Sequence, residues 1–379
     1  MPRAALLYCE QMMDYDFGRG HPLRPIRLRM TAELIRSYGL LDLPDSQLIT
    51  PRPVTETELL LAHDGSYIEA IRALSRNPDE DVDPSFGFYM SDNPPFAGMY
   101  ESSLLYTGAS AQAAEMVMRD EVDVSFSIAG GLHHARRARA SGFCIFNDAV
   151  VAVRRLQEKF GRILYIDIDA HHGDGVQEAF YDTDEVMTIS IHESGRWLFP
   201  GSGFVEEMGT GKGTGFSINA PLAPGSGDAE AVRVYDSAIQ PLIDAYAPQV
   251  VVAQLGVDGH FADPLAHLAY TSIGWLELVR RILSLGKPVV ALGGGGYDAR
   301  TVCRLWTLAY ALMLNQHVPD DIPNSFAETY RVCKLNDNFE PQMPVSEQRK
   351  VRLYADDTIR KIQQEIFPLH RIDTAVGSE

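Results

Sequence analysis

The sequence predicts an α/β protein with a single domain, in which a mostly parallel central β-sheet is flanked by helices on both faces. Short apolar runs recur along the chain, and each is followed by a polar turn and a stretch with helical spacing. This alternation is typical of parallel strands joined by helices. Apolar residues make up 45% of the 379 residues, which suffices for a large core. Neither a repeat nor an obvious linker interrupts the chain before about residue 335, so we expect one domain.

The first third of the chain is predicted to hold one strand and four helices. Residues 4–9 have the composition of a strand, and residues 77–98 lack any period, which favours a loop at the rim. The helices follow from apolar spacing, an acidic first turn or a glycine stop, and are expected at residues 24–41, 55–63, 63–74 and 99–119.

The rest of the chain repeats strand, polar turn and helix. Strands are expected at residues 122–129, 163–169, 186–194, 212–222, 249–258 and 287–293. Helices are expected at residues 142–157, 176–184, 229–247, 271–286, 299–314 and 345–367.

Composition narrows the classes of function. The net charge of −18 argues against nucleic-acid binding and suits a cationic peptide or amine, although it is also ordinary for an acidic protein. The four cysteines are widely spaced, which favours free thiols in a reducing compartment. We find neither a signal peptide nor an apolar run of the roughly 20 residues that span a membrane. The sequence therefore predicts a cytoplasmic protein without membrane contact.

The stretch ILYIDIDAHHGDG, residues 163–175, is the most informative part of the chain. Asp167, Asp169 and His171 are spaced two residues apart, so an extended chain points them to one side at the end of a strand. Carboxylates with an imidazole suit a divalent metal such as zinc. Capping of the next helix by an Asp is the alternative interpretation.

Four predicted strands end in unusual polar groups. Each group alone has an ordinary explanation: a structural His pair, a helix cap or a tight glycine loop. Together they would meet at one end of a single sheet. The four groups are His133 with His134; Asp167, Asp169, His171 and Asp174; Asp258; and Gly293–Gly296 with Tyr297.

These groups allow a metal centre. Asp169, His171 and Asp258 would bind the metal and leave one position open for water, as catalytic zinc requires. Two carboxylates nearly neutralise the ion, so its water should be less acidic than in an all-histidine site, where the pKa falls to about 7. Such a site needs a separate base.

The remaining polar groups can supply that base and an oxyanion donor. His133 and His134 each need a carboxylate to fix the tautomer, and Asp167 and Asp174 are the two acids left over. Tyr297, on the glycine-rich loop, could donate a hydrogen bond to a developing oxyanion. The combination suits metal-assisted hydrolysis of an amide.

The motifs that carry this chemistry also resemble a known family, the zinc-dependent histone deacetylases with the arginase-like fold. The similarity spans about residues 1–315, and the segment DGHFADPLAHL is most similar to the bacterial acetoin-utilization (AcuC-like) deacetylases. The matching motifs are HPLRPIRLRM, GGLHHARR, GFCIFND, DIDAHHGDGV, FPGSG, LGVDGHFADP and LGGGGYD.

The resemblance implies a role for each catalytic residue. His134 would pair with Asp174 and act as the main general base and acid. His133 would pair with Asp167 and act mostly through its charge. Tyr297 would polarise the acetyl carbonyl.

The resemblance also implies a substrate tunnel. Gly142, Phe143 and Phe199 would line it around the lysyl methylenes, and Leu265 would lie near its mouth. Asp92 would hold the substrate backbone at the rim. Ordinary core packing is the alternative for the two phenylalanines, and a solvated surface charge is the alternative for Asp92.

Further expectations concern ions and product release. Arg27 corresponds to an arginine of an internal channel through which acetate leaves. Zinc is the expected metal, with iron(II) as an alternative in the cell, and potassium is expected as a structural ion. The residues implied for two potassium sites are Asp167, Asp169, His171, Ser190 and Ile191, and then Phe180, Thr183, Val186 and Phe216.

Two departures from the family pattern stand out. Leu198 occupies a position where many relatives carry an aromatic residue, so the tunnel could be wider there. His260 and Asp263 follow Asp258 and are expected in a second polar shell or at the rim, because the residues that would bind a second metal are not evident.

The sequence thus predicts a zinc-dependent hydrolase that removes acetyl or related short acyl groups from lysine side chains of proteins. A deacetylase of acetylpolyamines or other small amines is the second hypothesis, and a non-catalytic acyl-lysine-binding protein is the third. The oligomeric state stays open. We expect a catalytic domain over residues 1–371, with a core over about 1–315 and a C-terminal helical extension over about 344–368, and a flexible tail over residues 372–379.

Overall fold

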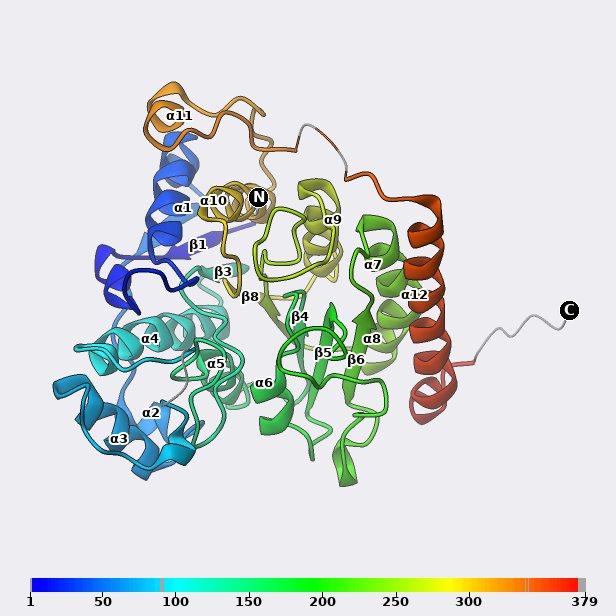
Figure 1. Cartoon of the computed structure of the whole chain (residues 1–379), viewed down its shortest axis with the longest axis horizontal. Helices are drawn as coiled ribbons and strands as arrows, with labels where there is room; N and C mark the ends of the chain where they lie inside the picture. The colour runs from blue at the N-terminus through cyan, green and yellow to red at the C-terminus, as the bar shows by residue number, and fades with distance from the viewer. Residues whose placement is uncertain (1, 89–91, 338, 340, 374–379) are drawn as a thin grey trace, which may run out of the picture.

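The computed structural model describes residues 2–88, 92–337, 339 and 341–373. Within them, eight strands form one sheet in the order β2-β1-β3-β8-β7-β4-β5-β6, and every pair is parallel (Figure 1). The predicted α/β class is confirmed, and the sheet is parallel throughout. The strands are β1 (Ala4–Leu7), β2 (Ser46–Ile49), β3 (Val124–Ser127), β4 (Ile163–Asp167), β5 (Val186–Glu193), β6 (Ser217–Leu222), β7 (Val250–Gln254) and β8 (Val289–Leu292).

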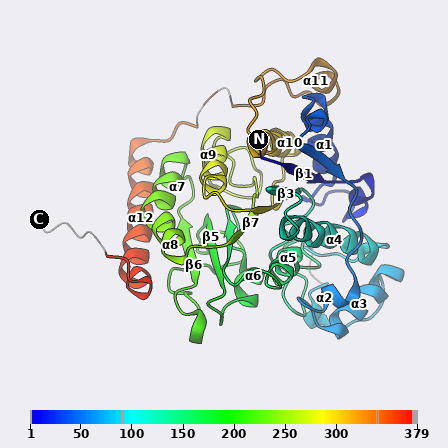
Figure 2. The same cartoon turned by 180° about the vertical axis from the view of Figure 1, so that it is seen from behind.

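Helices cover both faces of the sheet, which explains why its strands are continuous apolar runs. α4 packs on β3 and α5, while α1, α9 and α10 lie together on the other face (Figure 2). The helices are α1 (Ile26–Ser37), α2 (Glu56–Leu59), α3 (Gly65–Arg76), α4 (Met99–Met118), α5 (Asp148–Leu156), α6 (Asp174–Ala179), α7 (Asp228–Val234), α8 (Gln240–Tyr246), α9 (Ser272–Leu283), α10 (Ala299–Met313), α11 (Asn324–Tyr330) and α12 (Val345–Glu365).

Two short elements were not predicted. Strand β2 pairs only with β1 at the edge of the sheet, and its four residues are half-buried or exposed, so its sequence lacks the apolar run of an inner strand. Helix α11 spans only seven residues and buries only Phe326 among them, which is too little for a helical period to be visible.

Four predicted helices differ from what the sequence indicated. The helix expected over residues 142–157 begins only at Asp148, and the helix expected over residues 176–184 ends at Ala179. The helix expected over residues 55–63 ends at Leu59, because the chain turns at residues 60–64 to begin α3. The helix expected over residues 229–247 is interrupted by a π-helical turn, Tyr235–Ile239, just before Pro241. Proline lacks an N–H group and displaces the preceding carbonyl, which accounts for the wider turn.

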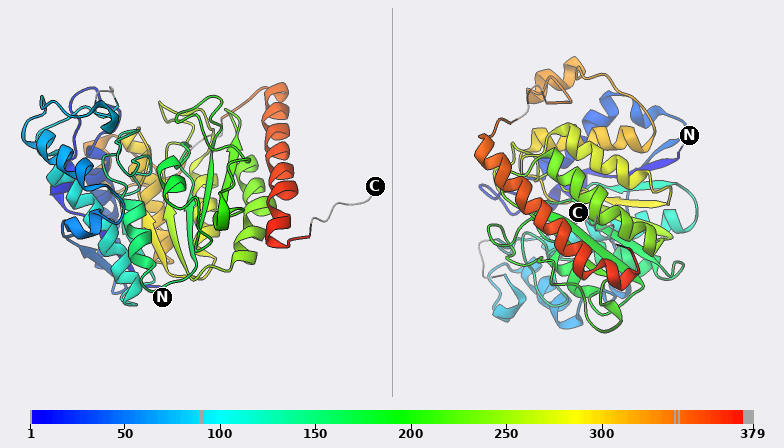
Figure 3. Two further views of the ribbon diagram at one scale, coloured as in Figure 1. Left: turned by 90° about the horizontal axis from the view of Figure 1, so that it is seen from below. Right: turned by 90° about the vertical axis from the view of Figure 1, so that its right-hand side faces the viewer.

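The C-terminal helix α12 covers the far edge of the sheet. It packs against β6 and α7, and Figure 3 shows it along the outside of the molecule. The Thr358 hydroxyl donates to the carbonyl of Pro221 in β6 at 2.8 Å. Residues 374–379 of the predicted tail lie outside the described residues. Within the described ranges, no helix has the length and apolar character needed to cross a bilayer.

The start of α2 supplies a test of stability. Thr55 and Glu58 form a reciprocal capping box, and Arg52 contacts the Glu58 carboxylate at 2.6 Å. Burial alone would raise the pKa of Glu58, but hydrogen bonds from Arg52 and from the Thr55 N–H lower it from 4.5 to about 2. The ionised carboxylate therefore stabilises the fold above pH 4.5, and this contribution is lost as the pH falls toward about 2.

We predict that Glu58→Gln lowers the free energy of unfolding at pH 7 by about 1 kcal/mol, the usual size for a lost helix cap. The difference from the wild type should shrink below pH 4.5. Urea unfolding at several pH values measures the free energy of unfolding of both proteins. Glu56→Gln, which removes an exposed ion pair with Arg72, is the matched control. Equal effects of the two variants at pH 7 would contradict the prediction.

Candidate metal and catalytic site

Three side chains from two adjacent strands meet at the carboxyl edge of the sheet. Asp169 and His171 follow β4, and Asp258 follows β7, the neighbour of β4. The Nδ1 atom of His171 lies 2.9 Å from Asp258 Oδ2 and 3.2 Å from Asp169 Oδ1. One ligand atom from each residue lies within 4.8 Å of the others, and all three residues are buried. Since parallel strands end at the same edge, this convergence follows from the topology.

A divalent cation fits this group. Burial and then the nearby Asp169 carboxylate raise the pKa of Asp258 to about 7, although His171 opposes the shift. Two carboxylates held this close in an apolar interior repel each other, and a bound cation would remove the repulsion. Two carboxylates with one imidazole are ligand types that divalent metals such as zinc accept.

The carboxylate of Asp169 is held by groups that the sequence did not single out. Its Oδ2 accepts hydrogen bonds from Gln254 Nε2 and from the Gly295 N–H, both at 2.8 Å. Gln254 is the last residue of β7 and its one polar residue. This single amide at the end of an apolar strand was the feature of the sequence that could have indicated a role at the site. A Cβ on Gly295 would overlap the Asp258 carboxylate, so only glycine lets the loop come this close.

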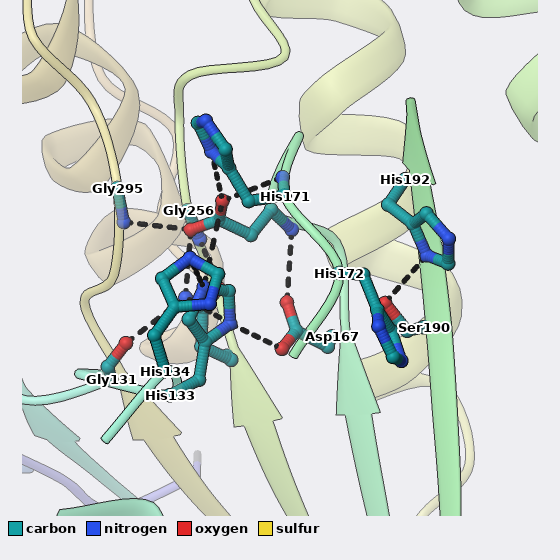
Figure 4. Close-up of polar contacts among 12 residues, drawn as sticks. Gly131, His133, His134, Asp167, His171, His172, Ser190, His192, Gly256 and Gly295 are labelled. Carbon is teal, nitrogen blue, oxygen red and sulfur yellow. Dashed lines mark hydrogen bonds and ion pairs between the residues drawn. The ribbon is translucent and has the colours of Figure 1, made fainter. Parts of the chain in front are cut away.

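Two His–Asp pairs lie beside the three candidate ligands. Figure 4 shows the first of these pairs, His133 with Asp167, next to His134. His133 Nδ1 is 2.8 Å from Asp167 Oδ2, and His134 Nδ1 is 2.7 Å from Asp174 Oδ1. The Nε2 atoms of the two imidazoles are 3.0 Å apart. Arg136 donates to the other oxygen of Asp174 at 2.9 Å. The structure thus brings the predicted base candidates together in the pairing that the family pattern implied.

The two imidazoles differ in charge. Burial alone would lower the pKa of His133, but the Asp167 and Asp169 carboxylates outweigh it and raise the value to about 9. Burial and the charge on His133 lower the pKa of His134 to about 4. The surroundings therefore favour the charged form of His133 and the neutral form of His134.

The loop that carries the imidazole pair is fixed by the start of α5. Asn147 donates to the carbonyl of Ala135 at 2.8 Å. The buried Asp148 carboxylate accepts the backbone N–H groups of Gly131 at 2.9 Å and Leu132 at 2.8 Å. In the sequence, this Asn-Asp pair stood out only as part of the family motif GFCIFND. The position of the pair near the start of a predicted helix could have indicated a capping role. Its hydrogen bonds to residues 131–135 are visible only in the folded structure.

The glycine-rich loop after β8 places Tyr297 beside the ligands. The Tyr297 N–H donates to Asp263 Oδ2 at 2.8 Å, and its ring lies 6.4 Å from that of His171. Arg27 is buried and donates to the carbonyls of Gly294 at 2.8 Å and Gly296 at 3.0 Å. Arg27 therefore holds this loop, and it also lines an internal cavity with Met12, Tyr15, Leu23, Tyr106 and Leu132.

Aromatic rings surround the approach to the site. The Phe143 ring lies 5.7 Å from that of Tyr297, and the Phe199 ring lies 4.9 Å from that of His134. A Cβ on Gly142 would collide with the His134 ring and lie 2.9 Å from Phe199 Cε1. Three predicted tunnel residues, Gly142, Phe143 and Phe199, thus lie next to His134 or Tyr297. Phe143 is partly buried and packs against the core, whereas Phe199 is exposed.

The predicted rim residues lie farther out. The carbonyl of Asp92 is 3.3 Å from His21 Nε2, and the His21 ring packs 4.5 Å from that of Phe143. The Leu265 N–H donates to Asp263 Oδ1 at 2.9 Å, so the Asp263 carboxylate joins the rim to the Tyr297 loop.

The residues implied for potassium lie beneath the site. The Ser190 hydroxyl is 2.8 Å from His192 Nδ1, and Ile191 is the next residue of β5. The Phe216 carbonyl accepts the Thr188 N–H at 2.9 Å. A carbonyl oxygen can accept from a second partner besides the N–H group, and both potassium sites stay predictions.

The two departures from the family pattern have defined surroundings. Leu198 packs partly buried against the core. His260 is buried and lies 2.9 Å from Asp337, a residue of the chain after α11. Asp263 contacts the Tyr297 loop, as described above.

Fold and site together define an α/β enzyme whose buried carboxylates and imidazoles can bind a metal at the carboxyl edge of a parallel sheet. Comparison with known proteins gives the family: a profile of the histone deacetylase domain matches residues 21–313, and the chain belongs to the histone deacetylase family. It is accordingly a hydrolytic deacetylase.

Individual relatives support the assignment. The chain is 40% identical over 332 residues to the acetoin utilization protein AcuC of Bacillus subtilis, covering 85% of each chain. It is 34% identical over 361 residues to histone deacetylase 1 of Homo sapiens, covering 93% of this chain and 72% of that one. A crystal structure of a histone deacetylase (HDAC) homologue from Aquifex aeolicus superposes with a TM-score of 0.86 at 32% identity, covering 95% of this chain and all of that one.

The metal site makes a direct prediction. Asp258→Asn should lower the bound divalent metal from about one equivalent to well below half, because the ligand loses its charge. Metal content after dialysis, measured by elemental analysis, tests this. Asp236→Asn, which alters a surface ion pair with Arg281, should retain the wild-type content. Full retention in Asp258→Asn would remove Asp258 from the ligand set.

Proposed function

We propose that this chain is a zinc-dependent protein lysine deacetylase that removes acetyl or similar short acyl groups. The observation that carries the proposal is the position of a neutral, carboxylate-bonded imidazole, His134, between the metal-ligand group and an aromatic approach. An extended chain of methylenes fits between aromatic rings, and an amide carbonyl at its end would reach the ligands.

The cation would be held by Asp169, His171 and Asp258, and when bound it supplies Lewis-acid chemistry toward the acyl carbonyl and a water molecule. His134 Nε2 takes the proton of the attacking water, and Asp174, 2.7 Å from Nδ1, stabilises the resulting imidazolium. The same proton then passes to the lysine nitrogen as the C–N bond breaks. The remaining hydroxyl proton of the acid also moves to the amine, so the products are acetate and the lysine ammonium group.

Two further groups act on the charge that develops during the reaction. His133 stays protonated and opposes the negative charge electrostatically. Tyr297 keeps its phenolic proton, because burial, followed by Asp258 and Asp169, raises its pKa well above 10. Its hydroxyl can therefore donate a hydrogen bond to the oxyanion.

The approach favours a substrate with a long side chain on a larger body. Phe199 is 40% exposed, so the aromatic wall begins at the surface. Asp92 lies next to this opening and can accept a backbone N–H group of a bound peptide. The net charge of −18 attracts cationic segments, and it would equally attract a small acetylated polyamine.

Tyr297→Phe should lower the turnover of an acetyl-lysine peptide by about two to three orders of magnitude, the usual effect of losing an oxyanion donor. Acetate release from zinc-loaded protein measures this. Tyr330→Phe removes a remote hydroxyl bonded to Glu33 and should leave turnover unchanged. Wild-type turnover in Tyr297→Phe would contradict the oxyanion role.

Competition between an acetyl-lysine peptide and acetylspermidine separates the substrate classes. We expect kcat/KM to be at least about tenfold higher for the peptide, because only the peptide offers a backbone N–H group to Asp92. Cleavage of acetylspermidine alone would favour the small-amine hypothesis. Tight binding of the peptide by metal-loaded protein without acetate release would favour a non-catalytic acyl-lysine-binding protein.

A further inference from the structure

The chain beyond α10 returns to the edge of the sheet that carries the site. The family profile ends at residue 313, near the end of α10. Between α11 and α12 the chain passes close to α9 and α10 (Figure 1), and there Asp337 contacts both helices and the loop after β7. A segment outside the matched domain therefore lies behind the ligand Asp258.

The Asp337 carboxylate joins three elements that are distant in sequence. Its Oδ2 accepts the Ser272 N–H at the start of α9 at 2.6 Å, and its Oδ1 accepts Arg304 of α10 at 3.0 Å. The same Oδ2 lies 2.9 Å from His260 Nε2. In return, the Asp337 N–H donates to the Ser272 hydroxyl at 3.0 Å. The side chains of Asp337 and His260 are 7% and 0% exposed, so these bonds are shielded from water.

The hydrogen bonds of His260 fix its tautomer. Its Nδ1 accepts the Ala262 N–H at 3.1 Å, so the ring proton is on Nε2 and is donated to Asp337. The His260 carbonyl accepts the Asp263 N–H at 2.9 Å, which closes the turn. Without Asp337, a buried N–H group would lose its acceptor, which costs more than the bond itself contributes.

The turn held by His260 carries two groups of the site. It begins at the metal ligand Asp258 and ends at Asp263, whose carboxylate accepts the Tyr297 N–H at 2.8 Å. A shift of this turn would therefore displace a ligand and the oxyanion donor together.

We propose that Asp337 is a positioning residue for the metal centre: through His260 it fixes the turn 258–263, and with it Asp258 and Tyr297. The inference rests on the proposed metal site and catalytic roles. It gives the chain after α11 a part in holding the site, through the contacts of Asp337 with His260, Ser272 and Arg304.

Asp337→Asn is the first test. The carboxylate accepts hydrogen bonds on both oxygens, whereas the amide has one oxygen and one NH2 group, so its NH2 group would face one of the present donors. We expect zinc release to a chelator to become about tenfold faster and kcat on the acetyl-lysine peptide to fall about tenfold, with KM within about twofold. Asp320→Asn is the matched control. The Asp320 carboxylate accepts the N–H of Asn336, the residue before Asp337, at 2.8 Å and does not contact the turn.

A double-mutant cycle with His260→Leu identifies the route of the effect. If Asp337 acts through His260, the two substitutions should be strongly non-additive in the rate of zinc release. His260→Gln retains a donor and should release zinc more slowly than His260→Leu. If Asp337→Asn does not fold, the comparison of zinc release between His260→Gln and His260→Leu still tests whether His260 positions the site.

Additive effects, or equal zinc release from Asp337→Asn and Asp320→Asn, would overturn the inference. Equal release from His260→Gln and His260→Leu would do the same. Failure of the proposed function would be distinct, because it would show in the wild type, as absence of bound zinc or of acetate release. The zinc-release comparison among variants does not depend on which acyl substrate is cleaved.

Discussion

The structure depends on the approach of two buried carboxylates, Asp169 and Asp258, at the ends of the adjacent strands β4 and β7. Such a pair is unfavourable in an apolar interior unless cations and hydrogen bonds compensate its charge. Here Gln254, Gly295 and the Ala170 N–H each donate to one of the carboxylates. The remaining oxygens and the imidazole of His171 face one another, which prepares the site for a divalent metal.

Support for this arrangement comes from the layer behind it. Arg27 holds the glycine loop, Asp148 holds the loop of the imidazole pair, and Asp263 joins the rim to Tyr297. Each of these charged groups bonds backbone atoms of a loop, because a loop without regular hydrogen bonds needs side chains to fix it. The proposed catalytic groups therefore lie on loops that buried charged groups hold. The contact of Asp337 with His260 adds a similar hydrogen bond from the C-terminal part of the chain.

The imidazole pair shows how one sequence motif yields two chemical roles. His133 and His134 are adjacent in the chain, yet the first lies near Asp167 and Asp169 and the second near the charge on the first. Their pKa values are consequently pushed apart, to about 9 and about 4. Separation of this kind supports the roles that we propose for the two groups, a fixed charge on His133 and proton transfer by His134.

The sequence by itself determined the fold class and the residues around the site. Apolar runs ending in polar clusters predicted parallel strands, and parallel strands place those clusters at one edge. β2 and α11 were missed because both are short and bury few residues, so neither shows an apolar run or a helical period in the sequence. Only the tertiary structure decided the partners of Gln254, Asp148 and Asp337. Their hydrogen bonds join segments far apart in the chain, and the spacing of residues along a sequence does not encode such contacts.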